Sequence, residues 1–136
     1  MYTGGCAANS PIDLSVLGLK SSVISLVGQD AFGSFVIDEL LKHGVDIRGI
    51  KQTDKIGTSV SIVLSLPDGE RSFIHHTGAN GVFTLSDIDE TVWMDSDFIF
   101  VGGSLLMPAF DGAPTAALMK KAQAAGKFTI LDTAWD

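Results

Sequence analysis

Cysteine, basic residues and long apolar runs are scarce in this sequence, and each shortage excludes a class of protein. The single cysteine, Cys6, excludes an internal disulfide and fits a reducing compartment. No apolar stretch approaches the roughly 20 residues that would span a bilayer, so no membrane association is expected. Lysine and arginine number 9 against 16 aspartates and glutamates, a net charge of −7. A chain this acidic has no general attraction for nucleic acid.

The sequence also shows no targeting segment and no low-complexity segment. Residues 1–5 show no basic segment followed by an apolar one, as a secretory leader would. There is no repeat at a fixed period and no run of like charges. We therefore expect a cytoplasmic protein.

What the sequence does contain is enough apolar material for one packed domain: 46% of its 136 residues are hydrophobic and 18% charged. Short apolar segments alternate with segments of helical spacing. The pattern predicts buried strands over 23–27, 98–101 and 128–131, and helices over 31–43 and 112–125. This alternation is typical of a layered α/β fold with a mostly parallel sheet.

Local signals predict where the helices begin and end. Asn9 or Ser10 can cap a first helix that holds Pro11 in its first turn and ends near Gly18. Asp30 is predicted as the N-cap of the second helix. Asp111 is predicted to cap the last one, and Ser86 a short helix before it.

Between residues 59 and 76, apolar and polar residues alternate at every second position. This alternation predicts an antiparallel hairpin with one face exposed to solvent, the wet face. One face of its first strand is apolar and the other carries serines. Pro67-Asp68-Gly69 is turn chemistry, and Arg71–His75 forms the return strand. Such a hairpin does not belong in a parallel sheet, so we expect it to project as a flap. The apolar face consists of Val60, Ile62, Leu64 and Leu66.

The last predicted strand ends at Asp132 with no helix to follow it, so the chain is expected to be an incomplete domain. A sheet cut at this point exposes an edge strand and an uncovered apolar face, and such edges pair with other chains. The isolated chain is therefore expected to dissolve poorly or to aggregate.

Three motifs can be set aside. Gly28 and Gly33 have the spacing that opens a phosphate-binding P-loop, but Ser34-Phe35 stand where Lys and Ser/Thr are required. His75 and His76 are adjacent on a strand and point to opposite faces, so they do not share a metal ion; they are interpreted as surface or substrate-facing residues. Cys6 has no identifiable base to activate it.

Small and polar residues at strand and helix ends are candidates for ligand contact, each with a plain structural alternative. The run Gly4–Asn9 enters a helix, where backbone N–H groups are free, but it also fits a glycine turn with an Asn cap. The loop at 77–81 could line a cleft or be an ordinary Gly/Asn loop. Gly102–Ser104 ends a predicted strand, where ligands bind in α/β sheets or where the chain simply turns. Asp132 and Asp136 share that ambiguity.

The order of these motifs resembles the ribokinase-like (PfkB) carbohydrate kinase family. Gly4-Gly5-Cys6-Ala7-Ala8-Asn9 is similar to its G-G-x-x-A-N signature, and Val27 to Gly33 to its V-G-x-D-x-x-G segment. Further similarities are His43-Gly44-Val45-Asp46, the hairpin ending in Asp68-Gly69-Glu70-Arg71, Gly78-Ala79-Asn80, and Asp132-Thr133-Ala134-Trp135-Asp136.

The resemblance implies a three-layer α/β/α fold with a small antiparallel lid. The chain would be one incomplete domain, with its core at 1–55 and 77–136 and its lid at about 56–76. The implied activity is transfer of the ATP γ-phosphate to a hydroxyl of a sugar or sugar acid, with Mg²⁺ as cofactor. The implied substrate-binding residues are Gly4, Gly5, Asn9, Asn80, Gly103 and Ser104.

Two parts of that family pattern do not occur here. Members carry a strand with a substrate-binding Asp before the glycine pair, and a later G-A-G-D motif whose Asp is the catalytic base. We therefore expect the chain to hold the sugar-side half only, with no catalytic residue, cofactor or metal, and to be inactive alone. The alternatives are a non-catalytic sugar-binding module or one that forms a homodimer through the lid. A dehydrogenase fragment would need G-x-G-x-x-G, which is absent.

Overall fold

The computed structural model describes residues 1–133. Its helices and strands, in chain order, are α1 (Cys6–Val16), β1 (Ser22–Gly28), α2 (Ala31–Lys42), β2 (Asp46–Thr53), β3 (Val60–Ser65), β4 (Arg71–His76), the 3-10 turns η1 (Gly78–Gly81) and η2 (Leu85–Asp87), α3 (Glu90–Met94), β5 (Phe98–Ser104), α4 (Ala113–Ala124) and β6 (Phe128–Thr133).

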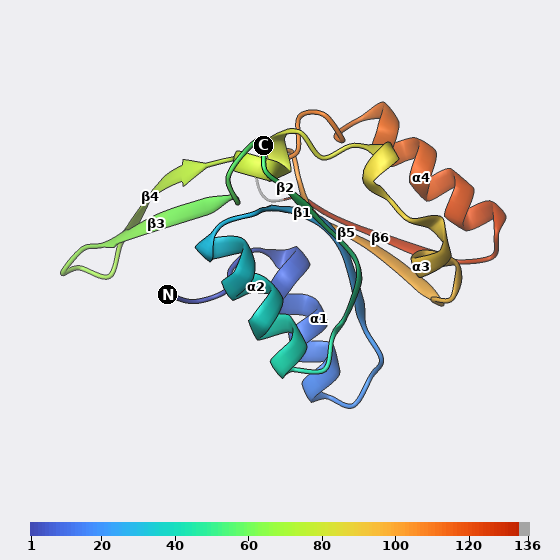
Figure 1. Cartoon of the computed structure of the whole chain (residues 1–136), viewed down its shortest axis with the longest axis horizontal. Coiled ribbons are helices and arrows are strands. Elements are labelled where there is room, and N and C mark those ends of the chain that lie inside the picture. Colours follow the sequence, from blue (N-terminus) through green and yellow to red (C-terminus); the bar gives the residue numbers. More distant parts are fainter. Residues whose placement is uncertain (134–136) are drawn as a thin grey trace.

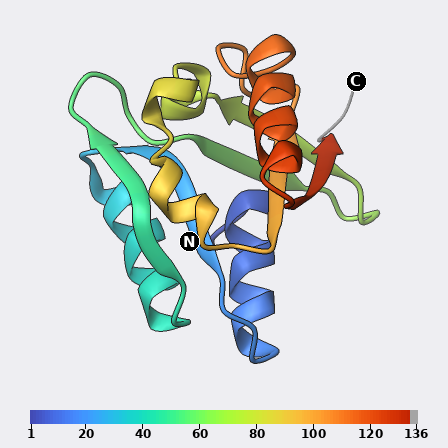
Figure 2. The ribbon, with the colours of Figure 1, turned by 90° about the vertical axis from the view of Figure 1, so that its right-hand side faces the viewer.

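The strands form a middle layer between two groups of helices. Helices α1 and α2 lie on one side of the strands, and α3 and α4 on the other (Figures 1 and 2). The hairpin β3–β4 projects from this body, and the N-terminal residues lie on the side toward which it extends (Figure 1). The predicted α/β class and the projecting hairpin are confirmed.

The parallel strands form two separate pairs, β1 with β2 and β5 with β6. Within residues 1–133 no ladder joins β1 to β5. The sequence analysis did not predict β2. Its apolar pattern is interrupted by Gly49, where an added Cβ would lie 2.6 Å from the Val23 carbonyl oxygen, so only glycine lets the two strands approach this closely.

Two apolar clusters hold the layers together. A small one joins α2 to the first strand pair through Val23, Leu40 and Val45. The larger one fills the space around β5 and α4, and its largest members are Leu26, Phe83, Trp93, Ile99, Val101, Phe110 and Leu118. Burial of these side chains away from water is the main force that stabilises the arrangement.

The first helix begins earlier than predicted. It starts at Cys6, so Asn9 and Ser10 lie inside the helix and do not cap it. Gly5 takes the cap position with φ 82°, a conformation that favours glycine, and the helix therefore begins four or five residues before the position that an Asn9 or Ser10 cap would give. Pro11 is buried within the helix.

Other predicted caps are also replaced by neighbouring residues. Gly112, with φ 76°, occupies the N-cap of α4, and Asp111 makes no cap bond there. The Asp111 carboxylate instead accepts bonds from the backbone N–H groups of Leu105 (2.9 Å) and Met107 (2.8 Å), which ties down the loop after β5. Asp89 caps α3, rather than Ser86.

The described part of the chain contains no helix long and apolar enough to cross a membrane.

Candidate functional site

A hydrogen-bonded clamp built on Asp30 joins the start of α2 to the base of the hairpin. The Asp30 carboxylate accepts bonds from the backbone N–H of Gly33 (2.8 Å), as predicted for an N-cap. It also accepts bonds from the backbone N–H (2.7 Å) and the hydroxyl (2.8 Å) of Thr58, 28 residues away. These donors, the Thr58 N–H first among them, lower the pKa of Asp30.

Thr58 links this clamp to the end of β1. Its buried hydroxyl oxygen accepts a bond from the backbone N–H of Gly28 at 2.9 Å. An added Cβ at Gly33 would lie 2.2 Å from the Gly28 carbonyl oxygen, and one at Gly28 would lie 2.6 Å from the Thr58 nitrogen. The two glycines therefore allow a strand, a helix and a loop to meet at one point.

The same clamp positions Asn80. Residue Gly57, next to Thr58, accepts a bond from the backbone N–H of Ala79 at 2.9 Å, which fixes η1 against the base of the hairpin. Ala79 is fully buried, and Asn80 beside it is half-buried. The backbone at Asn80 thus has a fixed place at the edge of the cavity described next.

A cavity of about 870 Å³ lies beneath the hairpin and extends between the two parallel strand pairs. Its walls come from β1, β5, α2, the first eight residues and the hairpin β3–β4, which contributes Val60 at its base and the face that carries Ser61 and His75. Four predicted substrate-binding residues line it: Gly4, Gly5, Asn80 and Gly103. The structure thus brings together residues that lie up to about 100 positions apart in the sequence.

The other two predicted residues are not in that lining. Asn9 is exposed on α1. Ser104 is buried, 6% exposed, and its hydroxyl donates to Asp111 at 3.2 Å. Ser104 therefore helps to hold the loop after β5, and this is the one bond that its hydroxyl makes among the described residues.

Glycines form the wall opposite the hairpin. An added Cβ at Gly102 would lie 3.0 Å from the Cys6 Cβ, so the start of α1 packs directly on β5. Gly5 and Gly103 have φ near 80°, and no atom lies within 4 Å of a Cβ built on either. This wall presents backbone groups, and its open space can admit a ligand.

The Cys6 thiol lies in this wall but is not activated. The Asp132 carboxylate, followed by burial, raises the pKa of Cys6 above its ordinary value. A thiol that stays protonated at neutral pH is a poor nucleophile. This agrees with the expectation that no base activates Cys6.

The hairpin contributes residues that the sequence analysis did not single out. Ser61, Val63 and Phe73 line the cavity together with His75. His75 pairs with Ser61 across the hairpin, and His76 pairs with Val60 on the other face, so the two histidines are separated as predicted. Side chains alternate between the two faces of a strand, so the sequence could have indicated that Ser61, Val63, Phe73 and His75 share one face.

The cavity lining is poor in charged groups, and its one terminal group is the α-amino group of Met1. None of its described residues is Asp, Glu, Lys or Arg. Residues 1–133 also contain no group of three His, Cys, Asp or Glu side chains placed to hold a metal ion. The arrangement can therefore offer a ligand hydrogen bonds and apolar contact.

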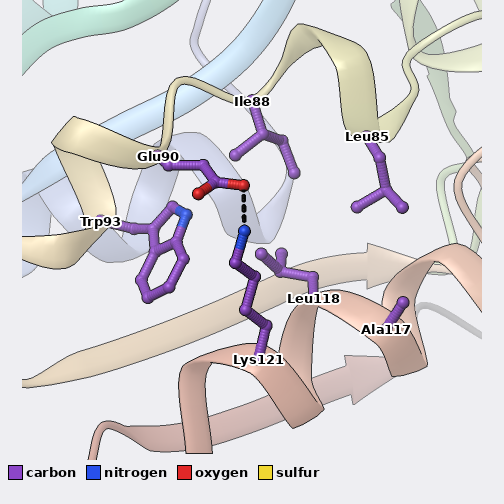
Figure 3. A pocket seen from close by; sticks show the side chains of 7 residues that line it. All are labelled: Leu85, Ile88, Glu90, Trp93, Ala117, Leu118 and Lys121. Atoms are coloured by element: carbon purple, nitrogen blue, oxygen red, sulfur yellow. Dashed lines mark hydrogen bonds and ion pairs between the residues drawn. The ribbon is translucent and has the colours of Figure 1, made fainter. Parts of the chain in front are cut away.

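A second, smaller cavity of about 180 Å³ lies between α3 and α4 (Figure 3). An ion pair between Glu90 and Lys121 spans it, and Ile88, Trp93 and Leu118 supply apolar walls. No predicted site residue lines it.

The comparisons with known proteins agree with this geometry. The sequence matches the pfkB family carbohydrate kinase over residues 1–136. The chain belongs to the pfkB carbohydrate kinase family. The predicted family and its fold are thus confirmed.

Two relatives and one solved structure show how far the similarity extends. A Pyrococcus horikoshii protein named as a sugar kinase is 36% identical over 106 residues, which cover 77% of this chain and 34% of that protein. Escherichia coli fructokinase is 30% identical over 129 residues, covering 95% of this chain and 42% of the enzyme. The structure of Xylella fastidiosa fructokinase with bound ATP superimposes with a TM-score of 0.85 at 28% identity, covering 98% of this chain and 42% of that one.

The pfkB chain thus spans less than half the length of the relatives that it matches. Asp136, at the end of the D-T-x-W-D segment, lies outside the described residues.

Proposed function

We propose that the whole protein transfers the γ-phosphoryl group of ATP to a hydroxyl of a sugar or sugar acid, and that this chain supplies the sugar-side half of the site. The observation that carries the proposal is the cavity beneath the hairpin, which no described Asp, Glu, Lys or Arg lines and which is bordered by glycine backbone on one side and by polar groups of the hairpin and Asn80 on the other. Backbone and amide groups that both donate and accept suit the hydroxyls of a polyol.

Each candidate residue has a distinct role in this proposal. Gly4, Gly5 and Gly103 let the sugar approach backbone atoms, and Asn80 offers an amide donor and acceptor. The hairpin acts as a lid that excludes water from the reacting group, since water would compete with the sugar for the phosphoryl group.

The ATP side of the reaction is assigned to the rest of the protein. Phosphoryl transfer depends on positioning and on cations that stabilise charge at the phosphate oxygens. Residues 1–133 offer no cluster suited to a metal ion, so Mg²⁺, ATP and the base that takes the hydroxyl proton are expected to be held by other residues. We also propose a cytoplasmic location, since Cys6 is a free thiol.

The test separates sugar binding from catalysis. Equilibrium dialysis of the 136-residue chain against radiolabelled sugars is expected to show binding, whereas a coupled assay with ATP and Mg²⁺ is expected to show no ADP formation above the blank. Turnover would refute the assignment of the base to other residues, and absence of sugar binding would refute the sugar-side role.

Two matched glycine variants provide the control. Gly103 and Gly126 have φ of 81° and 79°, and both have open space where a Cβ would lie. Gly103→Ala places a methyl group in the cavity wall and is expected to weaken sugar binding about tenfold. Gly126→Ala carries the same backbone strain at the end of α4 and is expected to leave sugar affinity unchanged. Equal losses would mean that strain alone explains the effect.

A second function has its own support on the hairpin. Ile62, Leu64 and Ile74 are 55%, 47% and 59% exposed, on the face opposite the cavity. Exposed apolar side chains of this kind mark contact surfaces. We propose that this face pairs two copies of the protein, a role that needs no catalysis by this chain.

A further inference from the structure

The inner face of the hairpin carries one polar group that has no hydrogen-bond partner among residues 1–133. In an antiparallel pair, residues directly opposite each other point to the same side. Ser61 lies opposite His75 and Val63 opposite Phe73, and all four line the cavity. The hairpin therefore presents one hydroxyl and one imidazole to the cavity, beside two apolar side chains.

The imidazole of His75 is held at one nitrogen and unpartnered at the other. Its Nδ1 lies 2.8 Å from the Ser61 Oγ, which fixes the ring. Its Nε2 is buried and has no hydrogen-bond partner among residues 1–133. A buried polar atom without a partner costs folding free energy of about 1–3 kcal/mol, so structures rarely keep one unless a ligand or water satisfies it.

The remainder of the cavity restricts the charge of that ligand. No Lys or Arg among the described residues lines it, and Met1, which carries the α-amino group, is 68% exposed, so a carboxylate beside His75 would have no buried cationic partner there. Burying an unpaired carboxylate is costly, whereas a hydroxyl needs only the hydrogen bonds that the walls offer. The lining therefore favours an uncharged sugar over a sugar acid.

We propose that His75 Nε2 binds a hydroxyl group of an uncharged sugar, with Ser61 as the residue that orients the ring. The inference rests on the proposed function and narrows its substrate class. It holds for either tautomer. If Ser61 donates to Nδ1, then Nε2 carries the proton and donates to the sugar oxygen. If Nδ1 donates to Ser61, then Nε2 accepts from the sugar hydroxyl.

The test compares sugars and variants by equilibrium dialysis of the 136-residue chain. The probes are radiolabelled D-fructose, D-ribose and D-gluconate. One of the two uncharged sugars is expected to bind at least about tenfold more tightly than gluconate. His75→Phe keeps an aromatic ring and is expected to weaken binding of that sugar about fivefold to tenfold, the effect of one lost hydrogen bond. His75→Gln returns an amide near the position of Nε2 and is expected to restore affinity to within about twofold.

Two further variants serve as controls. His76→Phe makes the same change on the opposite face and is expected to leave affinity unchanged. Ser61→Ala removes the orienting bond and is expected to weaken binding by about twofold to fivefold. Melting curves of each variant by circular dichroism verify that the chain still folds.

The outcomes separate this inference from the proposed function. If sugars bind but His75→Phe binds as the unaltered chain does, His75 is not a contact residue, and the proposed function stands. If gluconate binds most tightly, the substrate class is wrong, although the sugar-side role remains. If none of the three probes binds, the sugar-side role fails and this inference fails with it.

Discussion

Asp30 has the widest structural reach of any single side chain near the cavity. Its carboxylate receives bonds from Gly33 and Thr58, and Thr58 in turn receives one from Gly28. One side chain therefore fixes the helix start, the strand end and the base of the hairpin together. Its effect on a ligand is indirect, through the placement of Asn80 and the hairpin.

The depressed pKa of Asp30 predicts how stability depends on pH. The charged form gains bonds only in the folded state, so its contribution is fully present above the unfolded pKa of about 3.9 and disappears as the pH falls through the lower folded value. Asp30→Asn is therefore expected to melt at a lower temperature than the unaltered chain at pH 7. The difference should shrink steadily below pH 4.

Thermal unfolding followed by circular dichroism between pH 2.5 and 7 measures this difference. Asp38→Asn, on the exposed surface of the same helix, is the matched control and is expected to behave as the unaltered chain. A melting difference that is the same at pH 3 and pH 7 would contradict the role assigned to the Asp30 charge.

Local signals predicted half of this clamp. Asp30 and Gly33 stand three residues apart after an apolar strand, and that spacing alone predicts the N-cap. Thr58 could not be predicted as the partner, because it lies 28 residues away and only the folded chain brings it close. The same limit applies to His75, since its unpartnered nitrogen follows from burial, which no pattern of residue types states.

Among the elements, the hairpin carries different side chains on its two faces. The inner face carries Ser61 and His75 toward the cavity, and the outer face exposes Ile62, Leu64 and Ile74. The sequence analysis expected one apolar face and one wet face, but Val63 and Phe73 make the inner face partly apolar, and the apolar side chains on both faces are about half exposed. An uncovered apolar face of this kind is expected to contact a second copy.

Disulfide trapping tests that contact. In a Cys6→Ser background, Leu64→Cys places a thiol on the outer face, and mild oxidation is expected to convert most of the chain to a covalent dimer. Val63→Cys places its thiol on the inner face one residue away and is expected to remain mostly monomeric. Non-reducing gel electrophoresis measures both, and equal dimer yields would speak against pairing through the outer face.

Elements whose apolar residues recur at a regular spacing were predicted from the sequence. Elements in which that spacing is interrupted were not. Strand β1 and helix α2 follow from unbroken apolar spacing. Strand β2 was missed because its apolar residues are interrupted by charged ones and by Gly49, whose presence is explained only by the nearby Val23 backbone. The start of α1 was misplaced because a positive φ at Gly5 is a property of the folded chain.

The middle layer of the molecule contains two parallel strand pairs, with the cavity between β1 and β5. Strand β1 pairs only with β2 and β5 only with β6 within the described residues, and residues of β1 and β5 line the cavity between them. Each pair thus leaves both of its outer edges without a backbone partner among residues 1–133. Such edges are templates for pairing with another chain.

This arrangement predicts that the isolated chain self-associates. Size-exclusion chromatography with light scattering is expected to show species larger than the 14.3 kDa monomer, in a proportion that rises with concentration. Association should persist in the double variant Ile62→Lys/Ile74→Lys, because the strand edges remain. A monodisperse monomer that melts cooperatively would contradict the prediction.

The turn of the hairpin controls more than the direction of the chain. It is closed by a bond from the Leu66 N–H to the Glu70 carbonyl at 2.8 Å, with Gly69 at φ 90°. Because side chains alternate strictly, a slip of β4 by one residue against β3 would reverse every side chain it carries. The imidazole would then face outward and Ile74 would occupy its place. A single inserted residue at this distant tip could thus exchange hydroxyl recognition for hydrocarbon contact while every contact residue stays in the sequence.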